Sequence, residues 1–288
     1  MIITRISGGL GNQMFQYAIS KAIAQKNNDI FKLDISFYPK QSLRRYELNS
    51  FMIEENLANE DECIRLRGTE GIVSKLKTKL GWNIKRPTSY KYEHCLMTFD
   101  EKIWESSGDI YLDGFWQNEN YFKDIRNALL KDFKPRNPIS EKADSYLQDI
   151  KSLESVSLHI RRGDYILDQN TNEAHGTCQI NYYSKAIEYI NNILAAPHYF
   201  IFSDDIEWCK QNFVFLDNKT FIDQTKSAID DLMLMKNCKH NIIANSTFSW
   251  WGAWLNENYE KIVISPSKWF EKDEWQNLHP APMTWIKV

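Results

Sequence analysis

Residues 155–165 read Ser155-Val156-Ser157-Leu158-His159-Ile160-Arg161-Arg162-Gly163-Asp164-Tyr165, a short uncharged run that passes into a cluster of charged groups. The first part, Ser155 to Leu158, predicts a buried strand, so the charged cluster is expected at the carboxyl end of that strand. Open α/β sheets bind their ligands at this edge. Adjacent arginines there suit a diphosphate, because a guanidinium grips phosphate oxygens bidentately while it stays charged. A cluster of surface ion pairs is the alternative interpretation, because not every charge cluster marks a functional site.

The composition is that of an ordinary globular protein. Hydrophobic residues make up 43% and charged residues 25% of the 288 residues, so the chain can bury a sizeable core. The net charge of −3 gives no field that would favour nucleic acid as a partner. Any anion site must therefore be local.

The cysteines indicate a reducing compartment. The five cysteines are widely spaced, at positions 63, 95, 178, 209 and 238. They form neither a C-x-x-C pair nor the Cys/His spacing of a zinc site, and their number is odd. The first residues lead into a strand rather than a signal peptide, and no apolar run reaches membrane-spanning length. We therefore expect a cytoplasmic enzyme without a transmembrane segment, with peripheral association with the inner face of the membrane left open.

The second half of the chain alternates strands and helices. Strands are expected at 156–160, 199–202, 220–222, 241–244 and 262–264. Helices are expected at 182–194, 206–213, 228–238 and from residue 250 to 255. This alternation predicts a parallel, Rossmann-like sheet.

The first half is less regular. It has expected strands at 2–6, 31–33 and 110–112 and a helix from about residue 12 to 26. Residues 39–102 give no clear pattern. The polar segment 134–140, with two prolines, predicts a linker between domains 1–134 and 135–288. We therefore expect two α/β domains that face each other across a cleft.

A glycine turn follows the first strand. Gly8, Gly9 and Gly11 are three of the chain's eleven glycines, and such a turn lets the backbone approach a ligand and leaves helix amides for an anion. The pattern is neither G-x-G-x-x-G nor a P-loop, so a tight packing turn is an equal alternative. The amides of Asn12 and Gln13 are suited to sugar hydroxyls or phosphate.

A hydroxyl-rich block follows the strand expected at 241–244. It reads Asn245-Ser246-Thr247-Phe248-Ser249-Trp250-Trp251-Gly252. Ser246 is expected to cap the next helix. Thr247 or Ser249 is expected to contact the ligand, because a cap does not require so many hydroxyls.

The acidic pairs do not predict a metal site. Asp204-Asp205 lacks the D-x-D spacing of metal-dependent sugar transferases, and an Asp cap for the helix from residue 206 explains it. Asp230 and Asp231 stand at the start of an expected helix. The pair is either solvated or interacts favourably with the helix dipole. A carboxylate here could also accept hydrogen bonds from the N–H groups of a guanine. His175 lies in a polar loop after the arginine cluster and could line the cleft.

Together these segments resemble the α-1,2-fucosyltransferases of glycosyltransferase family 11. The matching segments are residues 8–17, 114–117 with 121–122, 159–165, 203–205, 231–235 and 242–253. They occur in the family's order between residue 1 and about residue 270, while residues 39–102 carry no matching motif.

The resemblance implies a GT-B-like architecture, with an N-terminal acceptor domain and a C-terminal GDP-fucose domain. It implies inverting transfer of L-fucose from GDP-β-L-fucose to the 2-hydroxyl of a galactose-type residue, without a metal or other cofactor. The expected partners are GDP-fucose and a galactose-containing oligosaccharide or lipid-linked glycan. A fucosyltransferase of another linkage and a non-catalytic GDP-sugar or glycan-binding module are the alternatives.

The resemblance also implies roles for single residues. Arg161 would neutralise the leaving β-phosphate, while Arg162 would support it or hold the loop. The general base is open between His159 and Asp164. The remaining expected contacts are His159 and Asp231 to the guanine, Ser249 with Thr247 to the pyrophosphate, Asn12 and Gln13 to the donor from the opposite domain, and Trp116, Gln117 and His175 on the acceptor side.

Overall fold

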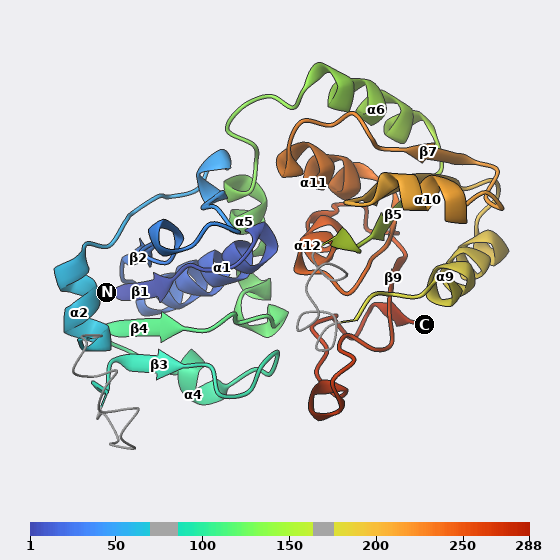
Figure 1. Ribbon diagram of the computed structural model, residues 1–288. Coiled ribbons are helices and arrows are strands. Elements are labelled where there is room, and N and C mark those ends of the chain that lie inside the picture. The colour runs from blue at the N-terminus through green and yellow to red at the C-terminus, as the bar shows by residue number, and fades with distance from the viewer. Residues whose placement is uncertain (70–85, 164–175) are drawn as a thin grey trace. The chain divides into compact units, whose positions relative to one another are not determined.

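The computed structural model describes residues 1–69, 86–163 and 176–288, which form two compact units (Figure 1). Unit 1 is Met1–Arg136 and unit 2 is Asn137–Val288. The boundary falls inside the proline-containing segment 134–140. The assignment of acceptor and donor roles to the two parts of the chain stays a prediction.

Unit 1 is built on a four-stranded parallel sheet with the order β2-β1-β4-β3. The strands are β1 (Ile2–Arg5), β2 (Phe31–Asp34), β3 (Tyr90–Tyr92) and β4 (Ile110–Asp113). The helices and 3-10 turns are α1 (Leu10–Asn27), η1 (Tyr38–Lys40), η2 (Leu48–Ser50), α2 (Glu60–Arg67), α4 (Glu101–Trp104), η3 (Glu119–Tyr121), η4 (Lys123–Ile125) and α5 (Arg126–Asp132).

The glycine turn allows α1 to begin directly after β1. Gly8 has a φ of +78°, a conformation that side chains with a Cβ rarely adopt. A Cβ at this position would also lie 2.7 Å from Asn12 Nδ2. The helix ends at Asn27 and is capped by Asn28, which has a left-handed conformation and whose N–H bonds back to the last turn.

A helix and a sheet strand of unit 1, α2 and β3, lie in the stretch that the sequence pattern left open. Helix α2 begins with a capping box, in which the Asn59 side chain accepts from the Glu62 N–H and the Glu62 side chain accepts from the Asn59 N–H. Strand β3 adds to the sheet beside β4. The sequence pattern made no prediction for this stretch, and the structure supplies these elements.

Unit 2 is built on a six-stranded parallel sheet with the order β10-β9-β8-β5-β6-β7. The strands are β5 (Ser155–Ile160), β6 (His198–Ser203), β7 (Lys219–Phe221), β8 (His240–Ile242), β9 (Val263–Ser265) and β10 (Ile286–Lys287). The helices and the 3-10 turn are α6 (Glu141–Ser152), α9 (Ile180–Ile193), α10 (Ile206–Asn212), α11 (Ala228–Asn237), α12 (Thr247–Leu255) and η5 (Asp273–Trp275).

Helices cover both faces of this sheet (Figure 1). Val156 and Leu158 of β5 pack with Tyr183 of α9 in one core cluster. Phe200 and Phe202 of β6 pack with α6 and α11 in the other. Because both faces are covered, every residue of β5 is buried, including its polar residues Ser155, Ser157 and His159.

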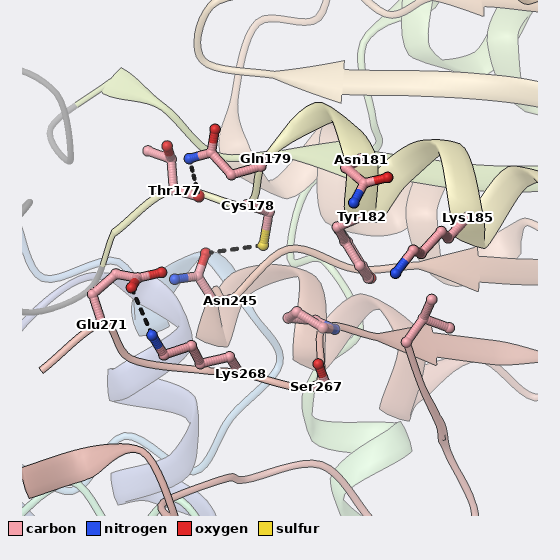
Figure 2. Close-up of a pocket in the computed structure, with 12 residues that line it drawn as sticks. Thr177, Cys178, Gln179, Asn181, Tyr182, Lys185, Asn245, Ser267, Lys268 and Glu271 are labelled. Carbon is pink, nitrogen blue, oxygen red and sulfur yellow. Dashed lines mark hydrogen bonds and ion pairs between the residues drawn. The ribbon is translucent and has the colours of Figure 1, made fainter. Parts of the chain in front are cut away.

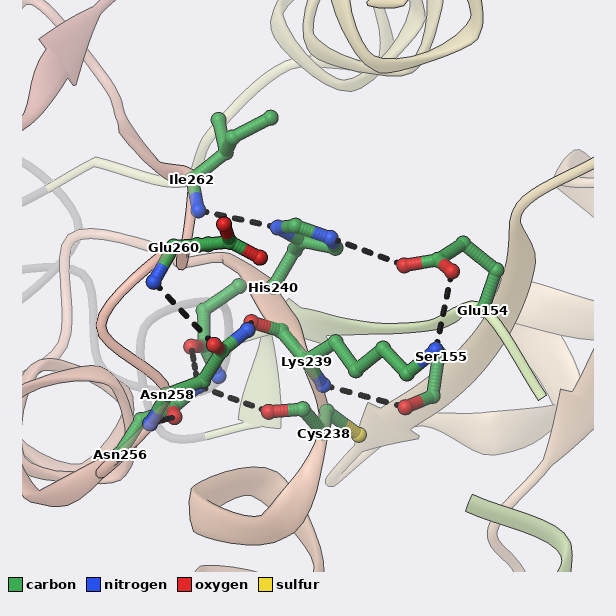
Figure 3. Close-up of polar contacts among 10 residues, drawn as sticks. Glu154, Ser155, Cys238, Lys239, His240, Asn256, Asn258, Glu260 and Ile262 are labelled. Carbon is green, nitrogen blue, oxygen red and sulfur yellow. Dashed lines mark hydrogen bonds and ion pairs between the residues drawn. The ribbon is translucent and has the colours of Figure 1, made fainter. Parts of the chain in front are cut away.

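The amino edge of this sheet is held by a polar network (Figure 3). Glu154 contacts His240 Nε2 at 3.1 Å and Lys239 Nζ at 2.9 Å, and His240 Nδ1 accepts from the Ile262 N–H at 3.0 Å. The network lies at the edge opposite to the arginine cluster, so it stabilises the sheet away from that cluster.

The α/β fold class with parallel sheets is confirmed. The facing of the two domains stays a prediction. In the part of the chain that the structure describes, no helix has both the length and the apolar character that crossing a bilayer would require.

Candidate functional site

The arginine cluster is paired with the acidic pair through the register of β5 and β6. Ile160 stands opposite Ser203, so the residues that follow these two strands meet. Arg161 Nη1 lies 3.0 Å from Asp204 Oδ2, and the backbone N–H of Arg162 donates to Asp204 Oδ1 at 2.9 Å. The role of Asp204 as an arginine partner was not predicted from the sequence.

The two arginines have different surroundings. The Arg162 guanidinium lies 3.9 Å from the centre of the Trp208 ring, and its Nε lies 3.2 Å from Asp205 Oδ2. Asp205 also accepts from the Trp208 N–H and caps α10, as the sequence predicted. Arg162 is therefore held against α10, whereas Arg161 pairs with Asp204 at the strand end, and the two side chains are similarly half-buried.

Asp204 also leaves no room for a side chain at position 163, which explains the glycine there. A Cβ at this position would lie 2.6 Å from Asp204 Oδ2. One carboxylate thus contacts the Arg161 side chain and the Arg162 backbone and packs closely against the Gly163 backbone, which fixes the chain as it leaves β5.

His159 is a buried, neutral imidazole. Its exposed fraction is 5%, and its ring centre lies 5.9 Å from that of Phe248. Nδ1 is buried and has no hydrogen-bond partner among the described residues. Burial lowers the pKa of His159 to about 4, with a further lowering by Arg161 that Asp204 opposes. A histidine with this pKa is a weak base at neutral pH, which favours a binding role over proton abstraction.

The neighbouring residues Asp230 and Asp231 are distinguished by their partners. Asp230 is buried and accepts from the Ser140 hydroxyl at 2.8 Å and from the Lys226 N–H at 3.1 Å, so its role is structural. Asp231 Oδ1 is buried and finds no partner in residues 1–69, 86–163 and 176–288. Burial raises the pKa of Asp231 to about 6. Asp231 is therefore the member of the pair that is suited to a ligand.

The hydroxyl-rich block begins α12. Ser246 caps the helix by accepting from the Phe248 N–H, as predicted. Ser249 is buried and donates to the Ser246 carbonyl at 3.3 Å. Thr247, at the first helical position, is only half-buried. The geometry therefore favours Thr247 over Ser249 as the more accessible hydroxyl for a phosphate.

In unit 1, Gln13 and Asn12 differ in their burial and in their hydrogen-bond partners. Gln13 is fully buried, and its Nε2 donates to the carbonyls of Gly8 and Arg45 while its Oε1 accepts from the Glu47 N–H. This side chain fastens the 45–47 loop to the glycine turn. Asn12 is half-buried and accepts from Gln117 Nε2 at 2.9 Å. The expected donor contacts of both residues stay predictions, and the geometry favours Asn12.

The turn after β4 is wrapped around a carboxylate that the sequence pattern did not single out. Glu93 accepts from the N–H groups of Phe115, at 2.6 Å, and Trp116, at 3.1 Å. Burial raises the pKa of Glu93. Trp116 has a φ of +58°, is fully buried, and has an indole Nε1 without a partner among the described side chains and backbone. Such strain in a non-glycine residue persists only where its surroundings hold it.

Two of the predicted residues, Asp164 and His175, lie outside the described residues. Within the described ranges, no group of three or more His, Cys, Asp or Glu side chains could hold a metal ion. The predicted roles of all site residues stay predictions.

Comparison with known proteins gives the chain a family context. The model of glycosyl transferase family 11 matches residues 1–281. An α-1,2-colitosyltransferase of Escherichia coli is 37% identical, with 100% of this chain and 99% of that protein covered. The Escherichia coli O-antigen biosynthesis glycosyltransferase WbnK is 34% identical, with 95% and 99% covered. The solved structure of NodZ α-1,6-fucosyltransferase soaked with GDP-fucose has a TM-score of 0.51 at 13% identity and covers 88% of this chain and 91% of its own, which shows a shared fold.

Proposed function

We propose that this chain, which belongs to glycosyltransferase family 11, transfers L-fucose from GDP-β-L-fucose to the 2-hydroxyl of a galactose-type residue in a glycan, with inversion to an α-1,2 linkage. The observation that carries the proposal is Arg161, oriented by Asp204 at the carboxyl end of β5. The α-1,2 linkage is supported by the name of the 37% identical relative.

The proposed role of Arg161 follows from the charge that develops in the reaction. Cleavage of the sugar–phosphate bond leaves negative charge on the diphosphate and positive charge at the anomeric carbon. A guanidinium that is already oriented stabilises this diphosphate without reorganisation in the transition state. Arg161 would supply this charge, while Arg162, stacked on Trp208, would hold the loop in place.

The nucleotide would be held by two buried atoms that have no hydrogen-bond partner among the described residues, His159 Nδ1 and Asp231 Oδ1. A guanine presents N–H donors that suit the Asp231 carboxylate. His159, neutral at pH 7, would offer Nδ1 as either a donor or an acceptor, depending on its tautomer. Thr247 with Ser249 would complete the pyrophosphate site.

No strong general base is part of the proposal. The pKa of His159, lowered to about 4 by burial, makes this side chain a weak base. We therefore propose a transition state with extensive cleavage of the bond to the leaving group, in which the acceptor hydroxyl passes its proton late to a weak base, for which Asp164 is the remaining candidate.

Colitose is a specific second candidate for the transferred sugar, because the 37% identical relative is named as a colitosyltransferase. Colitose lacks the 3-hydroxyl of L-fucose. A site that hydrogen-bonds this hydroxyl discriminates strongly against the deoxy sugar, whereas an apolar site does not.

The experiment is a transfer assay with GDP-fucose and GDP-colitose, separately and in competition, on soluble and lipid-linked galactose-containing acceptors. GDP release gives the rate, and NMR of the product gives the linkage. A parallel series contains EDTA, because the proposal includes metal-independent transfer. Binding of GDP without any GDP release from either donor, across the acceptor series, would instead support a non-catalytic module, and a product with another linkage would refute the α-1,2 assignment.

A further inference from the structure

A pocket of about 250 Å³ opens at the carboxyl edge of the unit 2 sheet, between the start of α9 and the segment after β9 (Figure 2). It lies beside the ends of β8 and β9, whereas Arg161 and Asp204 follow β5 and β6. The four strands are consecutive in the sheet order β9-β8-β5-β6. The pocket and the arginine cluster therefore share one edge of the sheet, where open α/β folds bind ligands.

The floor of the pocket is fixed by hydrogen bonds. Asn245 is buried, and its Nδ2 lies 3.2 Å from the carbonyl oxygens of Gly176 and Trp269. Its Oδ1 accepts from Cys178 Sγ at 3.4 Å. The Tyr182 hydroxyl donates to a backbone carbonyl at 2.6 Å. These contacts preform the pocket, as is usual for small-molecule sites.

The walls carry groups that donate and accept hydrogen bonds. Asn181 and Lys185 extend from α9, and Lys268 and Glu271 come from the opposite segment (Figure 2). Lys268 pairs with Glu271 at 2.8 Å, whereas Lys185 has no ion-pair partner among the described residues. An ammonium, an amide and a carboxylate together match a ring of sugar hydroxyls, each of which donates and accepts.

The volume limits the size of the ligand. Sites for drug-sized molecules measure about 300–1,000 Å³. A pocket of about 250 Å³ accommodates one monosaccharide rather than a nucleotide or an extended glycan.

Resting on the proposed function, we propose that this pocket is a subsite for one sugar unit, which hydrogen-bonds to Asn181, Lys185 and Glu271. The sugar is that of the nucleotide donor or that of the acceptor, since both present the same ring of hydroxyls. Asn245 is a positioning residue, because its hydrogen bonds to Gly176, Trp269 and Cys178 hold the floor of the pocket in place.

The test uses Asn181→Ala and Lys185→Gln in the full chain. Asn192→Ala is the matched control on the same helix, exposed and outside the pocket, and Lys151→Gln is the control at the exposed last turn of α6. Calorimetry with GDP and with GDP-fucose or GDP-colitose separates contacts to the donor sugar from contacts to the nucleotide. Transfer kinetics give the KM of the acceptor.

A donor-sugar subsite predicts that each pocket variant binds the GDP-sugar about 3- to 10-fold more weakly while its affinity for GDP is unchanged. An acceptor subsite predicts a rise of the same size in the acceptor KM with both affinities unchanged. The control variants should match the wild type. Pocket variants that match the wild type in all three measurements would overturn the subsite, whereas a wild type that transfers no sugar would refute the proposed function. In that case direct binding of GDP-sugar and GDP still tests the pocket.

Discussion

Replacing Arg161 and Arg162 one at a time tests whether the two adjacent guanidiniums have different tasks. Arg161→Ala removes the group proposed to stabilise the leaving diphosphate. The loss of one such preorganised donor costs about 2.7–4 kcal/mol of barrier, or about 10²–10³ in kcat. The ion pair with Asp204 is partly exposed, so its loss should cost only about 0–1 kcal/mol of stability.

Arg162→Ala should have the opposite profile. The variant loses the stacking on Trp208, worth about 0.5–2 kcal/mol, and the pair with Asp205, worth about 0–1 kcal/mol. A unit of this size loses about 2–4 °C of Tm per kcal/mol, so Tm should fall by about 1–12 °C. We expect kcat to fall less than tenfold once the fraction of folded protein is taken into account.

The assay is initial-rate GDP release with the donor that the wild type uses, beside thermal unfolding of each variant. Arg161→Lys is the informative intermediate, because an ammonium keeps the charge but loses the bidentate geometry. The division of tasks is refuted if Arg161→Ala stays within tenfold of wild-type kcat while folded, or if both alanine variants lose the same activity and the same stability.

Three further predictions concern single side chains. Because burial raises the pKa of Asp231 to about 6, the ligand-free protein should gain stability as pH falls and Asp231 is protonated, while guanine binding should weaken below about pH 6. Asp231→Asn should therefore raise Tm at pH 7 and weaken GDP binding in calorimetry. An unchanged affinity for GDP would contradict the proposed role of Asp231. Gln13→Ala leaves three backbone groups without their partner and should cost about 1–3 kcal/mol for each group that stays buried, whereas Gln25→Ala, exposed on the same helix, should not change Tm. Burial lowers the pKa of His240, so its contribution to the free energy of unfolding is fully present above about pH 6.5 and is lost as pH falls. His240→Gln, which can keep the contact with Glu154, should flatten the decline of Tm between pH 6.5 and 4. An unchanged slope would refute His240 as a source of acid lability.

The position of the arginine cluster could be predicted because it depends on local sequence. The uncharged segment of β5 passes directly into Arg161 and Arg162, so the end of the strand at Ile160 can be recognised in the sequence. The partner of Arg161 could not be read in this way. The pair with Asp204 depends on β5 and β6 being neighbours in register, which sequence periodicity does not determine.

The role of Gln13 shows a second limit. Its three hydrogen bonds go to backbone groups at positions 8, 45 and 47, two of which lie in a segment without periodicity. Backbone partners leave no trace in side-chain identity. By contrast, the capping box of α2 at Asn59 and Glu62 was present in the sequence as a polar start signal, and only the surrounding absence of pattern concealed it.

The distribution of partners along the carboxyl edge of unit 2 separates structural from ligand-binding groups. Arg162 pairs with Asp205 and Asp230 accepts from Ser140, and these protein contacts account for their positions. His159 Nδ1 and Asp231 Oδ1 are buried and have no hydrogen-bond partner in the described part of the chain. An unsatisfied buried polar atom costs about 1–3 kcal/mol, so these two atoms, with the Tyr183 hydroxyl as a third in unit 2, are a substantial cost for a marginally stable fold. A nucleotide that supplies both missing partners would recover this free energy on binding, which is why these two side chains, rather than the more numerous paired charges, mark where the base is expected to lie.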